Sequence, residues 1–240
     1  MRYGVVGDVH GNLHALRTAL DAVRAAGAET ILCPGDVVGY GPRPDECVEL
    51  LTEAGALVVA GNHDLMAIGE LPIERTGGVV RTTIEWTREN ISGATRAWLA
   101  ALPLELRTGD GVFMTHGAIG DPTRYIRDEA AAGRQLAAMY ERDPEAKVLL
   151  LGHTHHAASM RPPGGGWLVN AGSVGQSRER RPVARALVFD PESREADFLA
   201  LDYDVQATKR ELRERGLPPH ACHLAPGRLA RVRRRVASAR

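Results

Sequence analysis

The sequence predicts an α/β protein whose first strands are parallel. Along roughly the first sixty residues, short apolar runs alternate with helical apolar spacing in the order strand, helix, strand, helix, strand. A chain of 240 residues is long enough to bury one sizeable α/β core. Parallel strands joined by crossovers bring their carboxyl ends to one edge of a sheet, where such proteins bind ligands.

The apolar spacing places each N-terminal element. Leucine and valine recur at helical spacing after the first strand, and two prolines precede the second helix. The predicted elements are a strand at residues 3–6, a helix at 13–26, a strand beginning at 31–32, a helix at 45–54 and a strand at 57–60.

The remaining chain predicts a helical middle section and a second group of strands. Residues 65–102 are mostly helical in pattern, and their apolar positions are expected to pack on the core, or secondarily to form a lid over a site. Asp110-Gly111 predicts a tight hairpin turn. The further predicted strands are 104–107, 112–115, 147–151, 167–169, 184–189 and 196–201.

Five short polar motifs supply candidate metal ligands. In extended chain alternate side chains face the same way, so Asp8 and His10 project together, as do His153 and His155. Each motif alone is also consistent with a capped turn or helix start, but six of the nine histidines cluster in or next to them, counting His156 directly after the last motif. Two ions roughly 3.5–4 Å apart fit this inventory better than one. The motifs are Gly7-Asp8-Val9-His10, Gly35-Asp36, Gly61-Asn62-His63-Asp64, Thr115-His116-Gly117 and Gly152-His153-Thr154-His155.

The order of these motifs resembles the calcineurin-like metallophosphoesterase superfamily, whose small bacterial and archaeal phosphodiesterase-type branch is the nearest pattern. The match runs from Asp8 to about Asn170, where a following turn has Ala171 in place of the family's proline. The resemblance implies a four-layer α/β/β/α sandwich with two mixed β-sheets and a dinuclear site at strand ends. It implies a first metal on Asp8, His10 and His155, a second on Asn62, His116 and His153, and Asp36 as the bridge.

The resemblance also implies a reaction. His63 lies beside the substrate phosphate as general acid, and Asp64 is its expected partner, which orients and charges the imidazole. A metal-bridging hydroxide then attacks a small phosphodiester or phosphomonoester. The same water suits a second hypothesis, hydrolysis of a nucleotide anhydride such as a dinucleoside polyphosphate. A non-catalytic metal-binding scaffold is the third, and the free imidazole of His63 argues against it.

Mixed nitrogen and oxygen ligands favour two divalent transition-metal ions over Mg²⁺ or Ca²⁺. Manganese is the leading candidate, with Fe, Zn, Ni and Co as alternatives. Three side chains near the motifs are candidate substrate contacts. Tyr40 follows the bridging aspartate, although glycines and a proline around it also suit a structural turn. Arg124 and Tyr125 follow Pro122, where the alternative is the ordinary start of a helix.

Composition limits the partners. Thirty basic and 30 acidic residues cancel, so no net charge steers the chain to nucleic acid or membrane, and a nucleic-acid substrate is disfavoured. Three cysteines without a C-x-x-C spacing indicate a reducing compartment. The early start of the first strand leads us to expect no leader segment, and no run of about 18 apolar residues occurs in the sequence. We therefore expect a cytoplasmic enzyme with a small phosphorylated substrate, nucleotides included; the oligomeric state stays open.

The C-terminal region differs in character from the rest. A domain at 1–203 is expected to be followed by a charged helical extension at 204–240. Residues 205–215 predict a charged helix, and 228–240 contain six arginines. A solvated or weakly docked helix is the first interpretation, and a basic patch for an anionic polymer or partner chain is the second. His220 and His223 are expected to be solvated.

Overall fold

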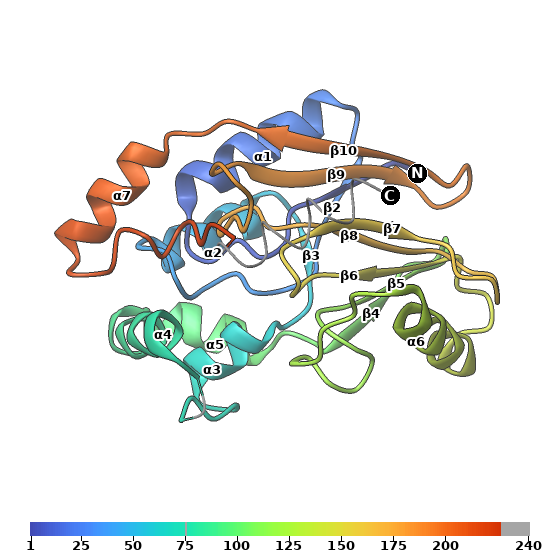
Figure 1. The fold of residues 1–240 in the computed structure, drawn as a ribbon, viewed down its shortest axis with the longest axis horizontal. Coiled ribbons are helices and arrows are strands. Elements are labelled where there is room, and N and C mark those ends of the chain that lie inside the picture. Colours follow the sequence, from blue (N-terminus) through green and yellow to red (C-terminus); the bar gives the residue numbers. More distant parts are fainter. Residues whose placement is uncertain (75, 227–240) are drawn as a thin grey trace.

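The computed structural model describes residues 1–74 and 76–226. Its strands form two five-stranded sheets in the orders β10-β9-β1-β2-β3 and β4-β5-β6-β8-β7 (Figure 1). The first contains β1 (Tyr3–Val5), β2 (Thr30–Cys33), β3 (Leu57–Val58), β9 (Ala184–Asp190) and β10 (Glu195–Leu201). The second contains β4 (Glu105–Arg107), β5 (Val112–Thr115), β6 (Val148–Leu151), β7 (Ala157–Met160) and β8 (Leu168–Ala171).

Both sheets are mixed, as expected. Strands β1, β2 and β3 are parallel, and β9 and β10 continue that sheet antiparallel. In the second sheet β5, β6 and β8 are parallel, with antiparallel β4 and β7 at the edges. The parallel strands at the centre of each sheet bring their carboxyl ends, and the motifs that follow them, to one region.

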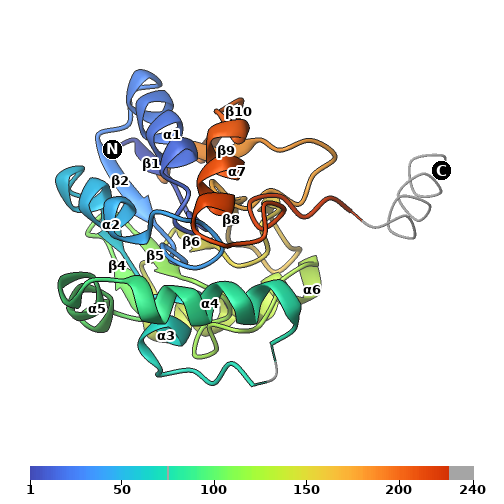
Figure 2. The same cartoon turned by 90° about the vertical axis from the view of Figure 1, so that its left-hand side faces the viewer.

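Helices cover the outer face of each sheet. Helices α1 (Leu13–Ala25) and α2 (Pro44–Glu53) pack on the first sheet, and α6 (Glu129–Arg142) packs on the second. Helices α3 (Asn62–Ile68), α4 (Gly78–Asn90) and α5 (Gly93–Ala100) gather at one end, while α7 (Val205–Glu214) lies beside α1 (Figure 2). The predicted four-layer sandwich is confirmed.

Alternating apolar side chains explain why the two sheets stack. Val112 and Met114 of β5 face the space between the sheets, where they meet Val5 of β1, whereas Phe113 faces α6. Strand β6 repeats the pattern, with Leu150 facing inward. A strand buried on both faces reads as a continuous apolar run, and that run is what predicted these strands from sequence.

Two elements were not predicted, and both have a physical reason. Helix α6 buries only a narrow stripe of side chains, Ala132, Leu136 and Met139, and Gly133 interrupts its apolar pattern, so its helical signal in the sequence is weak. Strand β7 is an edge strand with mostly exposed side chains, so it lacks the apolar signal of a core strand. The hairpin prediction is confirmed, because Thr108 N donates to Val112 O at 2.9 Å between β4 and β5.

The described part of the C-terminal extension is docked and not solvated. The Asp204 side chain caps α7, and Leu212 is buried against Leu217 and Trp86. His223, expected to be solvated, has Nε2 2.9 Å from the carbonyl oxygen of Glu179. The arginine-rich stretch 228–240 lies outside the described residues, so its interpretation stays a prediction.

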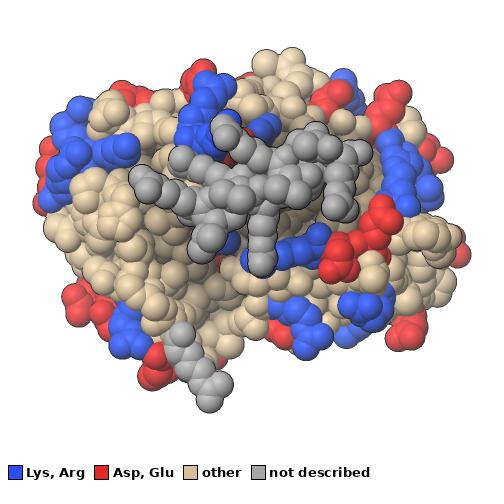
Figure 3. All heavy atoms as spheres, in the orientation of Figure 1, with Lys and Arg blue, Asp and Glu red and all other residues tan. Residues whose placement is uncertain are grey.

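Surface charge agrees with the balanced composition. On the face drawn in Figure 3, basic and acidic side chains are interspersed, and neither forms a continuous field. A search of the described residues for a helix with the length and apolar character needed to cross a bilayer finds none.

Candidate metal centre

The five motifs converge where the parallel strands of both sheets end. Asp8 and His10 lie in the loop after β1, and Asp36 follows β2. Every one of the seven predicted ligands is buried, with at most 7% of its surface exposed. The other four are Asn62 on the first turn of α3, His116 after β5, and His153 and His155 after β6.

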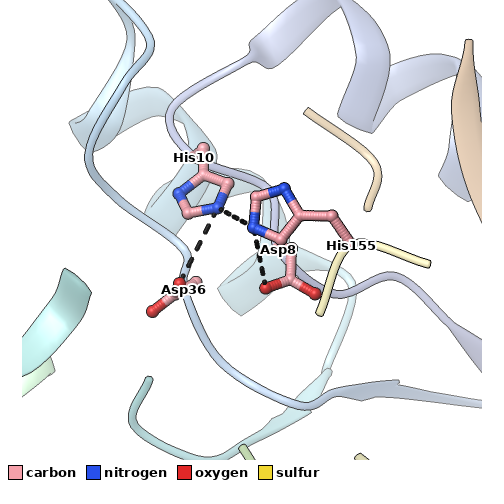
Figure 4. A group of neighbouring side chains, drawn as sticks. All are labelled: Asp8, His10, Asp36 and His155. Atoms are coloured by element: carbon pink, nitrogen blue, oxygen red, sulfur yellow. Dashed lines mark hydrogen bonds and ion pairs between the residues drawn. The ribbon is translucent and has the colours of Figure 1, made fainter. Parts of the chain in front are cut away.

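One group of donors combines Asp8, His10, Asp36 and His155, whose ligand atoms all lie within 4.8 Å of one another. Their side chains point toward one another in Figure 4. His10 Nε2 is 3.1 Å from His155 Nε2 and 3.7 Å from Asp36 Oδ2. His155 Nε2 is 3.5 Å from Asp8 Oδ1. These four residues are placed to bind one metal ion.

A second group shares Asp36 with the first. It contains Asp36, His116 and His153, again with ligand atoms within 4.8 Å. His116 Nε2 lies 3.3 Å from Asp36 Oδ2 and 3.0 Å from Asn62 Oδ1. Because one Asp36 carboxylate belongs to both groups, it stands where the resemblance expects a bridging ligand.

Backbone carbonyls fix which ring nitrogen faces the centre. Nδ1 of His10, His116 and His155 lies 3.2, 2.7 and 2.7 Å from the carbonyl oxygens of Val38, Pro34 and Gln176. A carbonyl oxygen only accepts, so each Nδ1 donates and Nε2 is left for a metal, the usual outer contact of a ligating histidine. In His153 the two ring nitrogens have the opposite roles. Its Nε2 donates to Thr123 O at 2.9 Å, so Nδ1 is left for a metal.

The donors fit a cation. With Nδ1 protonated, the neutral rings of His10 and His155 present lone pairs at Nε2 that face each other and cannot hydrogen-bond. Asp8 Oδ2 is also buried without a hydrogen-bond partner, and Asp36 Oδ2 has only ring-nitrogen contacts, with His116 Nε2 at 3.3 Å and His10 Nε2 at 3.7 Å. Buried acceptors without donors are costly unless a positive charge lies between them. The centre therefore suits divalent metal better than any internal hydrogen-bond network.

Burial and neighbouring charges set the protonation of the donors. Burial lowers the pKa of His10 and His155 well below the usual value and that of His153 to about 4. Neutral imidazole is the form that ligates metals. Burial opposes the charged form of His116 too, but the Asp36 carboxylate outweighs it and raises the pKa of His116 to about 9, so a metal that binds at His116 Nε2 has to displace a proton from it. Burial raises the pKa of Asp8 to about 7.

Unusual backbone conformation is concentrated at this centre. Among the described residues, seven non-glycine residues have positive φ, and six of them lie here. Left-handed backbone costs a non-glycine residue of order 1–3 kcal/mol, and such strain persists where function requires it. The six are Asp8, His10, Asp36, Tyr40, His153 and His155, with φ between 49° and 66°.

His63 lies beside the donors without being held by Asp64. Its ring centroid is 4.7 Å from that of His10, and its Nδ1 is buried with no hydrogen-bond partner. The expected Asp64–His63 pairing is wrong: Asp64 Oδ1 accepts from Val37 N and Val38 N at 2.9 and 3.1 Å. Asp64 Oδ2 accepts from Gly61 N at 2.9 Å. Asp64 ties together the two loops that carry Asp36 and Asn62.

Replacing Asp64 with alanine is expected to destabilise the fold. Three buried backbone N–H groups lose their acceptor, which is expected to lower the free energy of unfolding by about 3–5 kcal/mol. Urea denaturation measures this, with exposed Glu85→Ala as the control. Unchanged stability combined with a shifted pH profile of turnover would restore Asp64 as the partner of His63.

A cavity of about 540 Å³ opens above the centre. Tyr40 borders it but is only 3% exposed, with its ring against His10 and His63, so no ring face is free to stack on a substrate. Tyr125 stacks on His153 at 4.0 Å between ring centroids, and its hydroxyl contacts Arg178. Apolar side chains form the opposite wall, namely Met66, Leu71, Pro72 and Val80.

The arginine that lines the cavity is Arg178, for which the sequence predicted no role, and not Arg124. Arg124 is two-thirds exposed and pairs with Asp121 at 3.4 Å, and it is not among the residues that line the cavity. Tyr125 does not start a helix, because the next helix, α6, begins at Glu129. Arg178 lines the cavity instead. Sequence reasoning missed it because the stretch Arg178-Glu179-Arg180-Arg181 gives no signal that separates one arginine from another.

Comparisons with known proteins agree with this geometry. A family model described as the calcineurin-like phosphoesterase superfamily domain matches residues 1–194. An uncharacterized protein of Methanocaldococcus jannaschii is 28% identical over 229 residues, covering 89% of this chain and 93% of that protein.

Two crystal structures share the architecture. A metallophosphoesterase from Sphaerobacter thermophilus is 31% identical, with a TM-score of 0.76, 92% of this chain covered and 96% of that chain. A hypothetical protein from Pyrococcus horikoshii OT3 has a TM-score of 0.81 with the same coverages, 92% and 96%, at 20% identity, which shows the fold alone.

Proposed function

This chain belongs to the calcineurin-like phosphoesterase superfamily, a hydrolase family acting on phosphoric esters, and from that premise we propose that it uses two divalent metal ions to hydrolyse a small phosphodiester or phosphomonoester. The observation that carries the proposal is the shared Asp36. It joins the group of Asp8, His10 and His155 to the group of His116 and His153. One carboxylate common to two buried donor groups suits a pair of ions.

The proposed metal ions and the residues of the chain have different roles in the reaction. When bound, the ions supply Lewis-acid activation of the phosphoryl group and of the attacking water. Nitrogen and oxygen donors together suit Mn, Fe, Zn, Ni or Co, with manganese the first to test. Asn62 contacts His116, and Asp36 accepts from the backbone of His63, so both hold the start of α3 against the centre. His63, the residue after Asn62, therefore lies over the proposed substrate position.

His63 is the proposed proton donor to the departing oxygen. Burial lowers the pKa of His63, so its ring is neutral when the cavity holds no anion. A phosphate anion beside the ring favours the charged form and raises this pKa. With that phosphate in place, the ring is able to hold the proton that a general acid donates. Asp36 Oδ1 accepts from His63 N at 2.7 Å and fixes the position of that backbone.

The apolar wall of Met66, Leu71, Pro72 and Val80 supports an ester whose organic group is not strongly polar. An organic group placed there leaves its phosphoryl group over Asp36 and His63, which line the same cavity. Apolar lining with a few convergent polar groups is typical of a small-molecule site.

A metal-reconstitution screen tests the proposal. Chelator-stripped protein is expected to be inactive, and reloading with Mn²⁺ is expected to restore turnover together with about two bound ions per chain. Phosphomonoesters, cyclic nucleotides, phosphodiesters and dinucleoside polyphosphates form the panel, and elemental analysis counts the ions. Full turnover by stripped protein, or no turnover of any ester by reloaded protein, would refute the proposal.

A further inference from the structure

Arg178 is a cavity residue whose charge has no anionic partner among the described residues. It is half-buried and lines the same cavity as Asp36 and His63. Its Nε donates to Gln176 Oε1 at 3.3 Å, and its side chain also contacts the Tyr125 and Tyr40 hydroxyls. Asp8 attracts its charge from a distance but forms no ion pair with it. The adjacent carboxylate, Glu179, pairs with Arg185.

Neutral partners leave this guanidinium incompletely compensated. Burial opposes its charge, but Tyr125, Tyr40 and the carboxylate of Asp8 together outweigh burial and raise the pKa of Arg178, so the side chain stays charged. A partly desolvated cation without a counter-ion gains most from an anion that replaces its lost water. Phosphate oxygens suit the planar fork of arginine, which binds them through two parallel hydrogen bonds.

The segment that carries Arg178 is held firmly. The carbonyl oxygen of Gln176 accepts from His155 Nδ1 at 2.7 Å, and Gln176 N donates to Ser173 Oγ at 2.8 Å. Ser177 pairs with His223 in a β-bridge from the docked C-terminal segment. A side chain on a braced segment needs little ordering when a ligand binds, so little affinity is lost.

The hydroxyls of Tyr40 and Tyr125 both contact Arg178 and hold its side chain over the metal centre. Tyr40 follows β2 of the first sheet, and Tyr125 lies between β5 and α6 of the second. Their rings are fixed by His63 and His153, with centroid distances of 4.8 and 4.0 Å. Arg178 is therefore aimed into the cavity by residues that themselves contact the proposed acid and a proposed metal ligand.

We propose that Arg178 binds the phosphoryl oxygens of the substrate opposite the metal-binding floor, with Tyr40 and Tyr125 as positioning residues. This rests on the proposed phosphoesterase function and sharpens its substrate class. A monoester phosphoryl group carries a second negative charge that a diester lacks. Arg178 therefore stabilises the bound monoester more, and the site favours substrates with a terminal, dianionic phosphate.

Binding of inorganic phosphate to Mn-loaded protein tests the role without any turnover. Arg178→Ala and Arg178→Gln are expected to raise the phosphate dissociation constant roughly 10–100-fold in isothermal titration calorimetry, with the metal content unchanged. Arg180→Ala is the matched control, because it removes one exposed positive charge from the same segment. It is expected to change the constant by no more than about twofold.

Steady-state kinetics and a Tyr125 variant test whether Arg178 binds the phosphoryl group or only supports the fold. Arg178→Gln is expected to raise KM more for a monoester than for the matched diester. Tyr125→Phe keeps the ring over His153 but removes the hydroxyl, and it is expected to raise the phosphate dissociation constant by several-fold. Wild-type phosphate affinity in both Arg178 variants, or loss of metal from both, would overturn the inference. If wild-type protein binds phosphate through Arg178 but hydrolyses no ester, only the proposed reaction fails.

Discussion

Asp36→Asn is expected to empty both halves of the metal centre and to lower turnover by roughly 10³-fold or more. Asp36 Oδ2 is the one oxygen near both His10 and His116, at 3.7 and 3.3 Å. Asparagine has the same shape and still offers an oxygen to His63 N, so the loop is expected to fold. What it lacks is the negative charge that the two proposed cations would share.

Metal content and turnover are measured together on the Asp36→Asn protein. Elemental analysis after Mn²⁺ loading is expected to fall from about two ions per chain to fewer than one. Asp121→Asn is the matched control, because Asp121 lies on a loop near the cavity and pairs with exposed Arg124. A variant that keeps both ions with near wild-type turnover would show that Asp36 is not a bridge.

His63→Ala is expected to keep the metals and lose the acid. The seven proposed ligands remain, and the His63 ring contributes no hydrogen bond through Nδ1. Turnover of esters with basic leaving groups is expected to fall roughly 10²–10⁴-fold, the usual contribution of a positioned general acid. Esters of acidic alcohols such as nitrophenol need little protonation, so their turnover is expected to fall much less.

The comparison of leaving groups identifies the role of His63. Rates are plotted against the pKa of the leaving alcohol for wild type and variant, and the variant is expected to give the steeper dependence. His14→Ala is the control histidine, because His14 lies on α1 and contacts Glu211. Loss of metal from His63→Ala would make His63 a ligand, and equal rates on an alkyl ester would remove it as an acid.

Local patterns in the sequence predicted the candidate metal donors and the parallel strands that carry them. Each motif follows a short apolar run, and alternation along an extended chain predicted that Asp8 would lie with His10 and His153 with His155. Asp8 and His10 do share one donor group, but the expectation for His153 and His155 is wrong: they belong to different groups, because these residues have left-handed and not extended backbone. These features depend on neighbours a few residues apart. Such features can be recognised in a short stretch of sequence, and the five motifs together therefore predicted one site.

Which partners complete the site depends on long-range contacts that form only in the folded protein. Asp64 is adjacent to His63 in sequence, yet its carboxylate accepts from backbone N–H groups of a loop 26 and 27 residues away. Arg178 is one arginine of a charged stretch, and the tyrosines that aim it lie far from it in the chain. The C-terminal segment docks because the fold presents Trp86 to Leu212 and Leu217. Contacts between residues far apart in the chain produce no regular spacing that could be recognised in the sequence, because they depend on how the two sheets and their loops stack.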